Sequence, residues 1–422
     1  MLAPYIRILK RRDFFLLWFG QIISQFGDRL TQMALIGLVY RLEPGSPLGL
    51  AKMLSLAIIP VFLFSPAAGV YIDRWDKRKT MYLADILRGI FIVVIPLLLT
   101  QWQSVAAIYC LVFLSFSSGR FFVPAKMAIV PFLVEKEDLF LANSLISVTA
   151  MIAAVLGFGL GGIIVERWGV STAFYVDAVT FFFSGACVFL MSTKEKAKFA
   201  ASDFLHLGKD ALERVKESFV QEAKQGIAYL FSSPETRYAT KIFFLLFASI
   251  GSLYTIFIVF VQNALSTVTF ELGLLAVGAG AGLFLGALGY GRIASGFSVK
   301  KAINYSLFFS STYLLVFTLT LNKFPSFPLA LISCALLGVL VAPIIIAINS
   351  LIHHESANEF WGRIFSSLEI IIHFAFLLFM FLSSYLANLF TPFTIIVGIS
   401  IIMILASFIH ITGSRNDPRT GI

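Results

Sequence analysis

The sequence predicts an all-α polytopic membrane protein with twelve transmembrane helices arranged as two six-helix bundles. The mean hydropathy is +0.90. Hydrophobic residues make up 59% of the chain and charged residues only 13%, whereas charged residues are about 25% of an ordinary soluble domain. The apolar residues also form runs of roughly 20, the length that a helix needs to cross the hydrocarbon core of a bilayer.

Charged residues, Pro and Gly divide the chain into six candidate helices in each half. The first six cover residues 14–40, 48–72, 80–100, 103–123, 141–165 and 170–192. The second six cover residues 238–262, 270–293, 301–321, 326–350, 361–388 and 392–412. We therefore expect three parts, which are an N-terminal bundle over 1–192, a cytoplasmic linker over 193–237 and a C-terminal bundle over 238–422.

The expected linker carries the pattern of an amphipathic helix. Between Phe204 and Phe231, apolar residues recur at spacings of mostly three, four or seven, with Lys, Glu and Arg between them. Such a helix fits the cytoplasmic face of a membrane. A soluble linker helix that packs only on itself is the alternative.

The net charge of +9 lies in short breaks between the apolar runs. A nucleic-acid-binding protein would gather its basic residues on one solvated face, so we expect no nucleic-acid partner. The basic breaks fall on alternate sides of the predicted membrane. Under the positive-inside rule, this pattern places both termini and the linker in the cytoplasm, as expected for a bacterial-type inner membrane.

No motif indicates an enzyme. The chain lacks His-Glu-x-x-His, Gly-x-x-x-x-Gly-Lys-Ser/Thr and Gly-x-Ser-x-Gly, which are typical of zinc hydrolases, ATP-driven pumps and serine hydrolases. Cys110, Cys187 and Cys334 are far apart in apolar runs, and no carboxylate or Cys cluster accompanies His353-His354. We therefore expect no metal site and no cofactor.

Six charged residues separate the second and third predicted helices, in the segment Gly69-Val-Tyr-Ile-Asp73-Arg74-Trp-Asp76-Lys77-Arg78-Lys79. Each would cost about 2.5 to 3.5 kcal/mol at the centre of a bilayer, so the segment turns at a membrane surface. The pattern of Gly, three residues, Asp-Arg and a basic pair resembles the loop between helices 2 and 3 of the major facilitator superfamily of transporters. Asp76 stands where that family usually has Gly.

A second copy of this pattern follows the eighth predicted helix. From Gly291 to Lys301 the glycine and the basic pair are kept, and Ser295 replaces Asp73. Transporters built from two related bundles show such an internal repeat, with the substrate cavity between the halves near the bilayer midplane.

The resemblance is to the efflux-type branch that includes macrolide and siderophore exporters. The stretch Phe121-Phe-Val-Pro124-Ala-Lys126, with Pro131 after it, is similar to the loop between helices 4 and 5 of drug exporters and of lysophospholipid transporters. The resemblance implies a monomeric transporter in a lipid bilayer that exports a drug-like compound or siderophore in exchange for protons. The alternatives are a lysophospholipid flippase and, more distantly, a non-transporting membrane scaffold.

The same resemblance implies a cytoplasmic gate. Asp73 would lie near Arg363 at the start of helix 11, where a helix N-terminus favours a carboxylate, and Arg74 would bridge to helix 4. The further residues that we assign to this gate are Gly69, Lys77, Arg78, Asp85, Arg88 and Arg120.

The fifth predicted helix contains the glycine-rich stretch Gly157-Phe158-Gly159-Leu160-Gly161-Gly162. Small residues let two membrane helices approach closely, so we assign Gly157, Gly161 and Gly162 to helix packing. The stretch is similar to the Gly-Pro-x-x-Gly-Gly motif of antiporter branches. Phe158 occupies the Pro position, which leaves antiport open.

Asp28 is the strongest candidate for a coupling carboxylate. Counting about 1.5 Å per residue from Phe14 places it roughly 21 Å along helix 1, near the midplane. Ionisable groups at that depth almost always face a protein interior or a water path. Arg29 is its neighbour, but consecutive helical residues point in different directions. Arg29 is then either an anion contact or the partner of a carboxylate on another helix.

Three further polar residues lie in the predicted helices. Glu369 and His373 are four residues apart on one face of helix 11 and either relay a proton or only hold that helix to a neighbour. Asp177 is a weaker candidate for proton coupling, because it lies within two turns of the outer end of helix 6, where solvation by water is the alternative.

Overall fold

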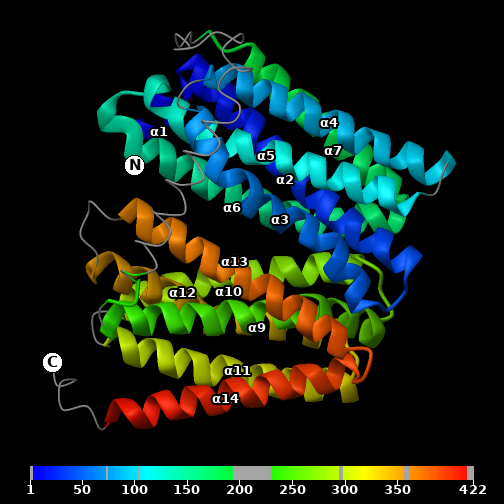
Figure 1. The fold of residues 1–422 in the computed structure, drawn as a ribbon, viewed down its shortest axis with the longest axis vertical. Helices are drawn as coiled ribbons and strands as arrows, with labels where there is room; N and C mark the ends of the chain where they lie inside the picture. Colours follow the sequence, from blue (N-terminus) through cyan, green and yellow to red (C-terminus); the bar gives the residue numbers. More distant parts are fainter. Residues whose placement is uncertain are drawn as a thin grey trace. The chain divides into compact units, whose positions relative to one another are not determined.

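The computed structural model describes residues 3–72, 75–101, 104–192, 228, 230–232, 234–293, 298–355 and 361–415. Helices account for nearly all of these residues (Figure 1). The gate residues Asp73 and Arg74, the repeat residue Ser295 and nearly all of the predicted amphipathic helix over 204–231 lie outside the described residues.

The first half of the chain forms six long helices, which are α2 Arg12–Leu42, α3 Pro47–Ile72, α4 Lys77–Gln101, α5 Val105–Leu133, α6 Leu139–Trp168 and α7 Val170–Phe189. A short helix, α1, covers Ala3–Leu9, and a 3₁₀ turn at Lys136–Asp138 connects α5 to α6. The second half forms α9 Pro234–Leu265, α10 Phe270–Ile293, α11 Val299–Lys323, α12 Phe327–Glu355, α13 Trp361–Leu386 and α14 Pro392–Arg415.

Eleven of these long helices are apolar and long enough to span a membrane, judged on the described residues by length and composition. The remaining long helix is α2, which has 31 residues and carries Asp28 and Arg29 near its middle. The predicted fold, two bundles of six transmembrane helices, is therefore the fold of this protein.

Helix α5 extends ten residues beyond its predicted end at residue 123. Pro124 and Pro131 lie inside the helix, so the expectation of a loop there was wrong. Each proline removes one backbone hydrogen bond. The helix continues because its last turns bury the apolar side chains of Phe122, Ala125, Ile129, Val130 and Leu133 in the core of the bundle.

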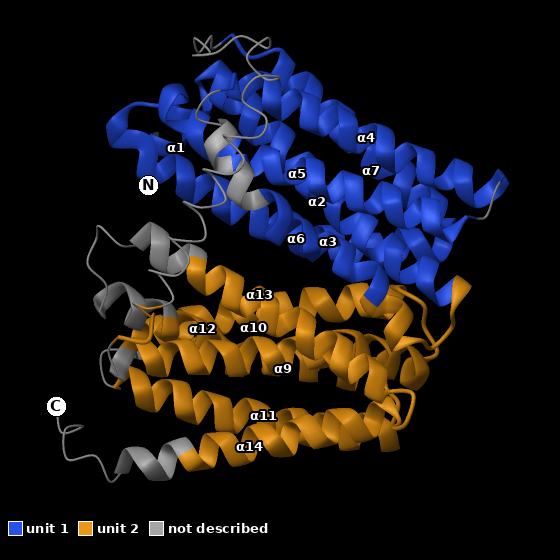
Figure 2. Cartoon of the chain, viewed as in Figure 1, with its two compact units in different colours: residues 1–41, 52–220 blue, residues 42–51, 221–422 orange. Residues whose placement is uncertain are grey.

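The chain divides into two compact units (Figure 2). Unit 1 contains residues 1–41 and 52–220, and unit 2 contains residues 42–51 and 221–422. The boundary at residues 220 and 221 falls inside the linker that the sequence predicts.

The two units are copies of one six-helix fold. Each long helix of unit 2 begins 222 or 223 residues after its counterpart in unit 1, as in the pairs Lys77 and Val299, Val105 and Phe327, and Val170 and Pro392. The packing is repeated as well, since α4 packs against α5 and α7 while α11 packs against α12 and α14. Residues 222 apart are called counterparts below.

Counterparts also match in detail at the start of the third helix of each unit. The Asp76 carboxylate accepts a hydrogen bond from the Lys79 backbone N–H at 2.9 Å, and the Ser298 hydroxyl accepts one from the Lys301 N–H at 3.4 Å. Each cap satisfies one of the backbone donors that a helix start leaves unpaired. Asp76, the departure from the usual family pattern, therefore has a structural explanation.

The buried cores of the two units use the same positions. Three pairs of counterparts are each at most 3% exposed, namely Ile8 and Leu230, Met81 and Ile303, and Phe122 and Ile344. Unit 2 is therefore an internal reference that shows which residues of unit 1 the fold itself requires.

Candidate functional site

Asp28 forms an ion pair with Arg88 inside unit 1. The Arg88 Nη2 group, on α4, donates to Asp28 Oδ1 on α2. The Arg88 guanidinium also lies 4.0 Å from the centre of the Phe181 ring of α7. The side chains of Asp28 and Arg88 are 26% and 10% exposed, so the pair is largely removed from water yet still reachable through Asp28.

Asp85 lies one turn before Arg88 and is fully buried. Its Oδ1 atom is 3.9 Å from Arg88 Nη1. The Ser184 hydroxyl is a polar neighbour of the carboxylate, but neither carboxylate oxygen has a partner in hydrogen-bond geometry among the described residues. The expected gate residues Asp85 and Arg88 thus belong with Asp28 in the structure. A buried carboxylate in this state is an expensive arrangement, which indicates a role other than packing.

Asp177 is also fully buried, between α7 and α2. Its carboxylate accepts hydrogen bonds from the hydroxyl of Thr31 on α2 and from the hydroxyl of Thr180 at 3.0 Å. Solvation of Asp177 from the outer surface, the alternative that its position left open, does not occur in this structure, because helix α2 covers it. Asp28 and Asp177 are near enough for their negative charges to repel each other.

Lys126 adds a second cation to this region. Its Nζ group, on α5, donates to Gln21 Oε1 on α2 at 3.1 Å. The charges of Asp28 and Asp85 both act on Lys126. Lys126 joins the network because α5 stays helical past Pro124, which carries this residue to the face of α2.

We call the five residues Asp28, Asp85, Arg88, Lys126 and Asp177 the charge network. It contains three carboxylates and two cations, so it carries one excess negative charge when every group is ionised. Low-dielectric surroundings strengthen repulsion between the carboxylates. One proton bound anywhere in the charge network balances its charge.

Unit 2 has no charged residue at the corresponding positions. The counterparts are Ile250, Leu307, Ser310, Ile348 and Ile399. Leu307 and Ile348 are at most 1% exposed and belong to the core of unit 2. The six-helix fold therefore forms with uncharged side chains at these sites, and the charges of unit 1 are not a requirement of the fold.

Arg29 points to a different neighbour from Asp28. Its guanidinium lies 5.2 Å from the Phe158 ring centre on α6, and its Nη1 group donates to Gln32 Oε1 at 3.0 Å. A Cβ on Gly157 would lie 2.8 Å from both Arg29 Cβ and the Phe26 carbonyl oxygen. The glycine therefore allows α6 to pass this close to α2.

The same glycine-rich stretch contacts α2 further along. A Cβ on Gly161 would lie 3.2 Å from Met33 Cγ and 3.3 Å from Leu30 Cδ2. Gly162 is buried in the same helix. Phe158, which stands at the expected proline position, is the residue on which Arg29 rests.

The other expected gate residues contact their own unit where their side chains are described. Arg78 donates to the Phe189 carbonyl oxygen at 2.7 Å, and Arg120 donates to the Ala57 carbonyl oxygen at 3.2 Å. Lys77 is buried at the start of α4. Gly69 lies in the last turn of α3, and Arg363 lies in the first turn of α13, where side chains are not described.

Glu369 and His373 lie one turn apart on α13. Glu369 is exposed on α13. The His373 Nδ1 atom lies 2.8 Å from the backbone carbonyl oxygen of Glu369, so its ring nitrogen bonds the helix backbone at this point. The contact described between the two residues therefore runs to the backbone of Glu369.

Sequence reasoning missed Lys126 and the pairing of Asp28 with Arg88. The sequence pattern places Lys126 in a loop, because two prolines flank it. The spacing of Asp85 and Arg88 shows only that they share a face of α4. A comparison of the two halves of the sequence could have found these residues. Each member of the charge network has an uncharged counterpart 222 residues later.

A family model described as transmembrane secretion effector matches residues 2–352 of the chain. This protein belongs to that family of major facilitator transporters. The transporter is 25% identical over 403 residues to the putative bacilysin exporter BacE of Bacillus subtilis, a match that covers 95% of this chain and 94% of that protein. It is 23% identical to macrolide efflux protein A of Streptococcus pyogenes over 89% of both chains.

One further relative matches only part of the chain. The transporter is 26% identical over 172 residues to the uncharacterised MFS-type transporter YfiS of Bacillus subtilis, and the match spans 41% of this chain and 40% of that protein's length. Among solved structures, a bacterial homologue of the iron transporter ferroportin in an inward-facing state matches with a TM-score of 0.70 and 13% identity. The match covers 94% of this chain and 98% of the other. At that identity the likeness concerns the fold alone.

Proposed function

We propose that this transporter exports an amphipathic small molecule, a drug-like compound or siderophore, in exchange for protons by alternating access. Two relatives that match most of the chain are named as a putative bacilysin exporter and a macrolide efflux protein. We place the transporter in the bacterial inner membrane with both termini in the cytoplasm, because the basic residues of the chain gather on that side.

The charge network is the observation that supports proton coupling. The charge network has one more carboxylate than it has cations. It lies inside a membrane bundle, and its counterparts in unit 2 are uncharged. Ionisable residues at such depth commonly form ion pathways and proton relays. Asp28 is the principal coupling carboxylate in this proposal, because it is partly exposed while Asp85 and Asp177 are fully buried. A proton reaches the network through Asp28 and is released when Arg88 forms the ion pair again.

The loop from Gly69 to Arg78 closes the cytoplasmic side in this proposal, together with Arg120 and Arg363. Asp85 and Arg88 act differently, since their contacts place them with Asp28. They connect the protonation state of Asp28 to the position of α4.

Flux in proteoliposomes tests the function. Purified transporter is reconstituted with an imposed pH gradient, and uptake of a radiolabelled macrolide, bacilysin or lysophosphatidylglycerol is measured. We expect gradient-driven flux of the macrolide or bacilysin in the wild type and background flux in Asp28→Asn, because the amide cannot bind and release a proton.

Glu369→Gln is the matched control, since it neutralises an exposed carboxylate in the other unit. We expect it to retain flux. Full flux in Asp28→Asn would remove Asp28 from the mechanism, and movement of lysophosphatidylglycerol alone would replace the exporter with a lipid transporter.

A further inference from the structure

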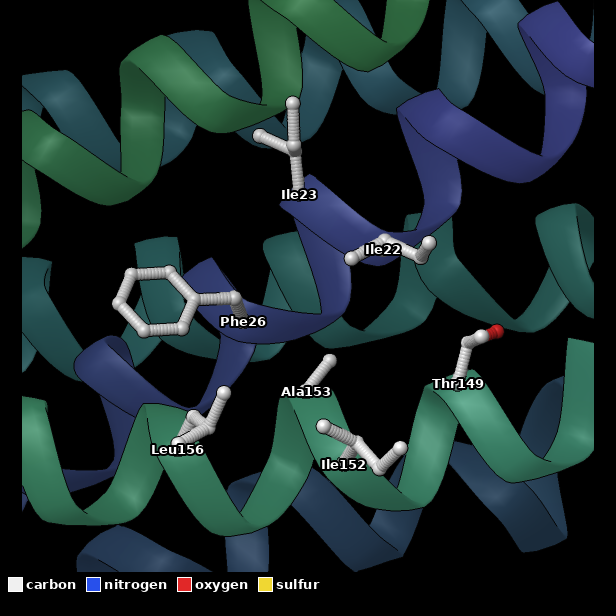
Figure 3. A pocket seen from close by; sticks show the side chains of 7 residues that line it. All are labelled: Ile22, Ile23, Phe26, Thr149, Ile152, Ala153 and Leu156. Atoms are coloured by element: carbon white, nitrogen blue, oxygen red, sulfur yellow. The ribbon is translucent and has the colours of Figure 1, made fainter.

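An apolar pocket lies between α2 and α6 of unit 1. Its volume is about 270 Å³. Ile22, Ile23 and Phe26 of α2 form one wall, while Thr149, Ile152, Ala153 and Leu156 of α6 form the other (Figure 3). The pocket therefore has room for a compact apolar group of the size of a fused aromatic ring pair.

The walls offer a ligand no free polar group. Thr149 is the single polar residue among the seven that line the pocket. Its hydroxyl donates to the Leu145 carbonyl oxygen at 2.7 Å and accepts from Trp18 Nε1 at 3.1 Å. A molecule in the pocket must keep any polar group beyond the walls.

Arg29 lies one turn along α2 from the pocket wall at Phe26. Its guanidinium donates to Gln32, and its buried Nε group has no partner among the described residues. Among the residues that the structure describes, no carboxylate oxygen is 4.0 Å or less from the Arg29 guanidinium. The neighbouring Asp28 is paired with Arg88 instead. In the described part of the chain, Arg29 is thus a cation near the middle of a membrane helix without a counter-ion.

The fold does not need this cation. The counterpart of Arg29 in unit 2 is Gly251, where a Cβ would overlap the carbonyl oxygen of Phe376 on α13. The helix pair α9 and α13 is the counterpart of the pair α2 and α6. In α9, Gly251 allows the close crossing with α13 and no arginine is present at that position. An arginine inside a membrane span that helix packing does not require indicates a ligand site or an ion path.

We propose that the pocket and Arg29 together bind an amphipathic organic anion, whose apolar body fills the pocket and whose carboxylate or phosphate pairs with Arg29. The planar guanidinium matches both anions with two parallel hydrogen bonds. The Phe158 ring of α6 packs against the Arg29 guanidinium. This inference rests on the proposed export function for its biological role and names the substrate class as anionic.

Equilibrium binding tests the inference without any gradient. The transporter in lipid nanodiscs is titrated by calorimetry with 1-naphthylacetate and with 1-naphthylmethylammonium, which share an aromatic body and carry opposite charges. We expect the anion to bind and the cation to bind at least tenfold more weakly. Arg29→Gln should weaken anion binding roughly tenfold or more, and Arg29→Lys should restore part of it.

A matched pair of variants on α6 tests the position of the site. Leu156 and Leu160 are 52% and 46% exposed, and only Leu156 lines the pocket. Leu156→Trp should abolish binding, and Leu160→Trp should leave it unchanged. Equal binding of the two probes, equal loss in the two tryptophan variants or full binding by Arg29→Gln would each overturn the proposal.

Competition distinguishes the two sources of the anion. Displacement of 1-naphthylacetate by lysophosphatidylglycerol indicates a lipid source, and its absence indicates a soluble organic anion. Because binding needs no gradient, failed flux with intact anion binding would count against the export proposal and not against this site.

Discussion

The two units differ at the residue scale in the charge of their buried positions. Asp85 and Leu307 occupy equivalent places on α4 and α11, and both are at most 1% exposed. Leucine packs there without penalty, whereas the carboxylate of Asp85 has no partner in hydrogen-bond geometry among the described residues. Burial of the Asp85 carboxylate therefore costs folding free energy, which the nearby Arg88 guanidinium offsets in part.

We predict that Asp85→Leu keeps or raises the stability of the transporter while it lowers proton-driven flux. The change removes a buried carboxylate that has no hydrogen-bond partner among the described residues, which relieves its desolvation cost. Arg88 keeps Asp28 as its partner. The measurement is the free energy of unfolding in mixed detergent micelles, with flux measured in parallel. A large loss of stability would show that the Asp85 carboxylate has a structural partner.

We predict the opposite result for Arg88→Gln, which removes the cation and leaves two carboxylates. Breaking a buried ion pair on one side typically costs about 3 to 5 kcal/mol. The double variant Asp28→Asn with Arg88→Gln should recover much of that loss, because no unpaired charge remains at Asp28. Additive effects of the two changes would argue against a direct interaction between them.

Glycines determine packing at the scale of the element. In unit 2, α10 and α12 cross so closely that a Cβ on Gly282 would overlap the Ala335 carbonyl oxygen. Gly289 lies two turns further along the same helix, and a Cβ added there would meet no heavy atom within 4 Å. Close approach of the two helices therefore requires glycine at residue 282 and not at residue 289.

Gly282→Ala should accordingly destabilise unit 2 and Gly289→Ala should not. The backbone of α12 must move to admit the new methyl group at residue 282, while residue 289 has free space. Thermal unfolding of both variants in nanodiscs provides the comparison. Similar melting temperatures for the two would mean that α10 and α12 separate easily.

Helices and their number were predictable from the sequence, and the contacts between them were not. Hydropathy located the spans because each span must be apolar by itself. The extension of α5 past Pro124 was missed, since proline signals a helix end locally while the buried side chains that override it are supplied by other helices. The pairing of Asp28 with Arg88 joins residues 60 apart, which no local pattern encodes.

At the scale of the whole molecule, the orientation of the chain in the membrane is a prediction. Reporter fusions at Ser202 and near Arg415 should give cytoplasmic signals, because basic residues cluster around both. A fusion at Gly45, between α2 and α3, is the control and should give a signal from the opposite side. A cytoplasmic signal at Gly45 or a periplasmic one at Arg415 would contradict the orientation.

The composition of α2 has a consequence for how the protein is made. During synthesis α2 leaves the ribosome before α4, and each of its two central charges costs about 2.5 to 3.5 kcal/mol at the bilayer centre on insertion scales. Arg88 is the partner that neutralises Asp28, and it is translated 60 residues later. We therefore expect α2 to stay beside the translocon, in contact with protein or water, until α4 arrives and the two helices enter the lipid together.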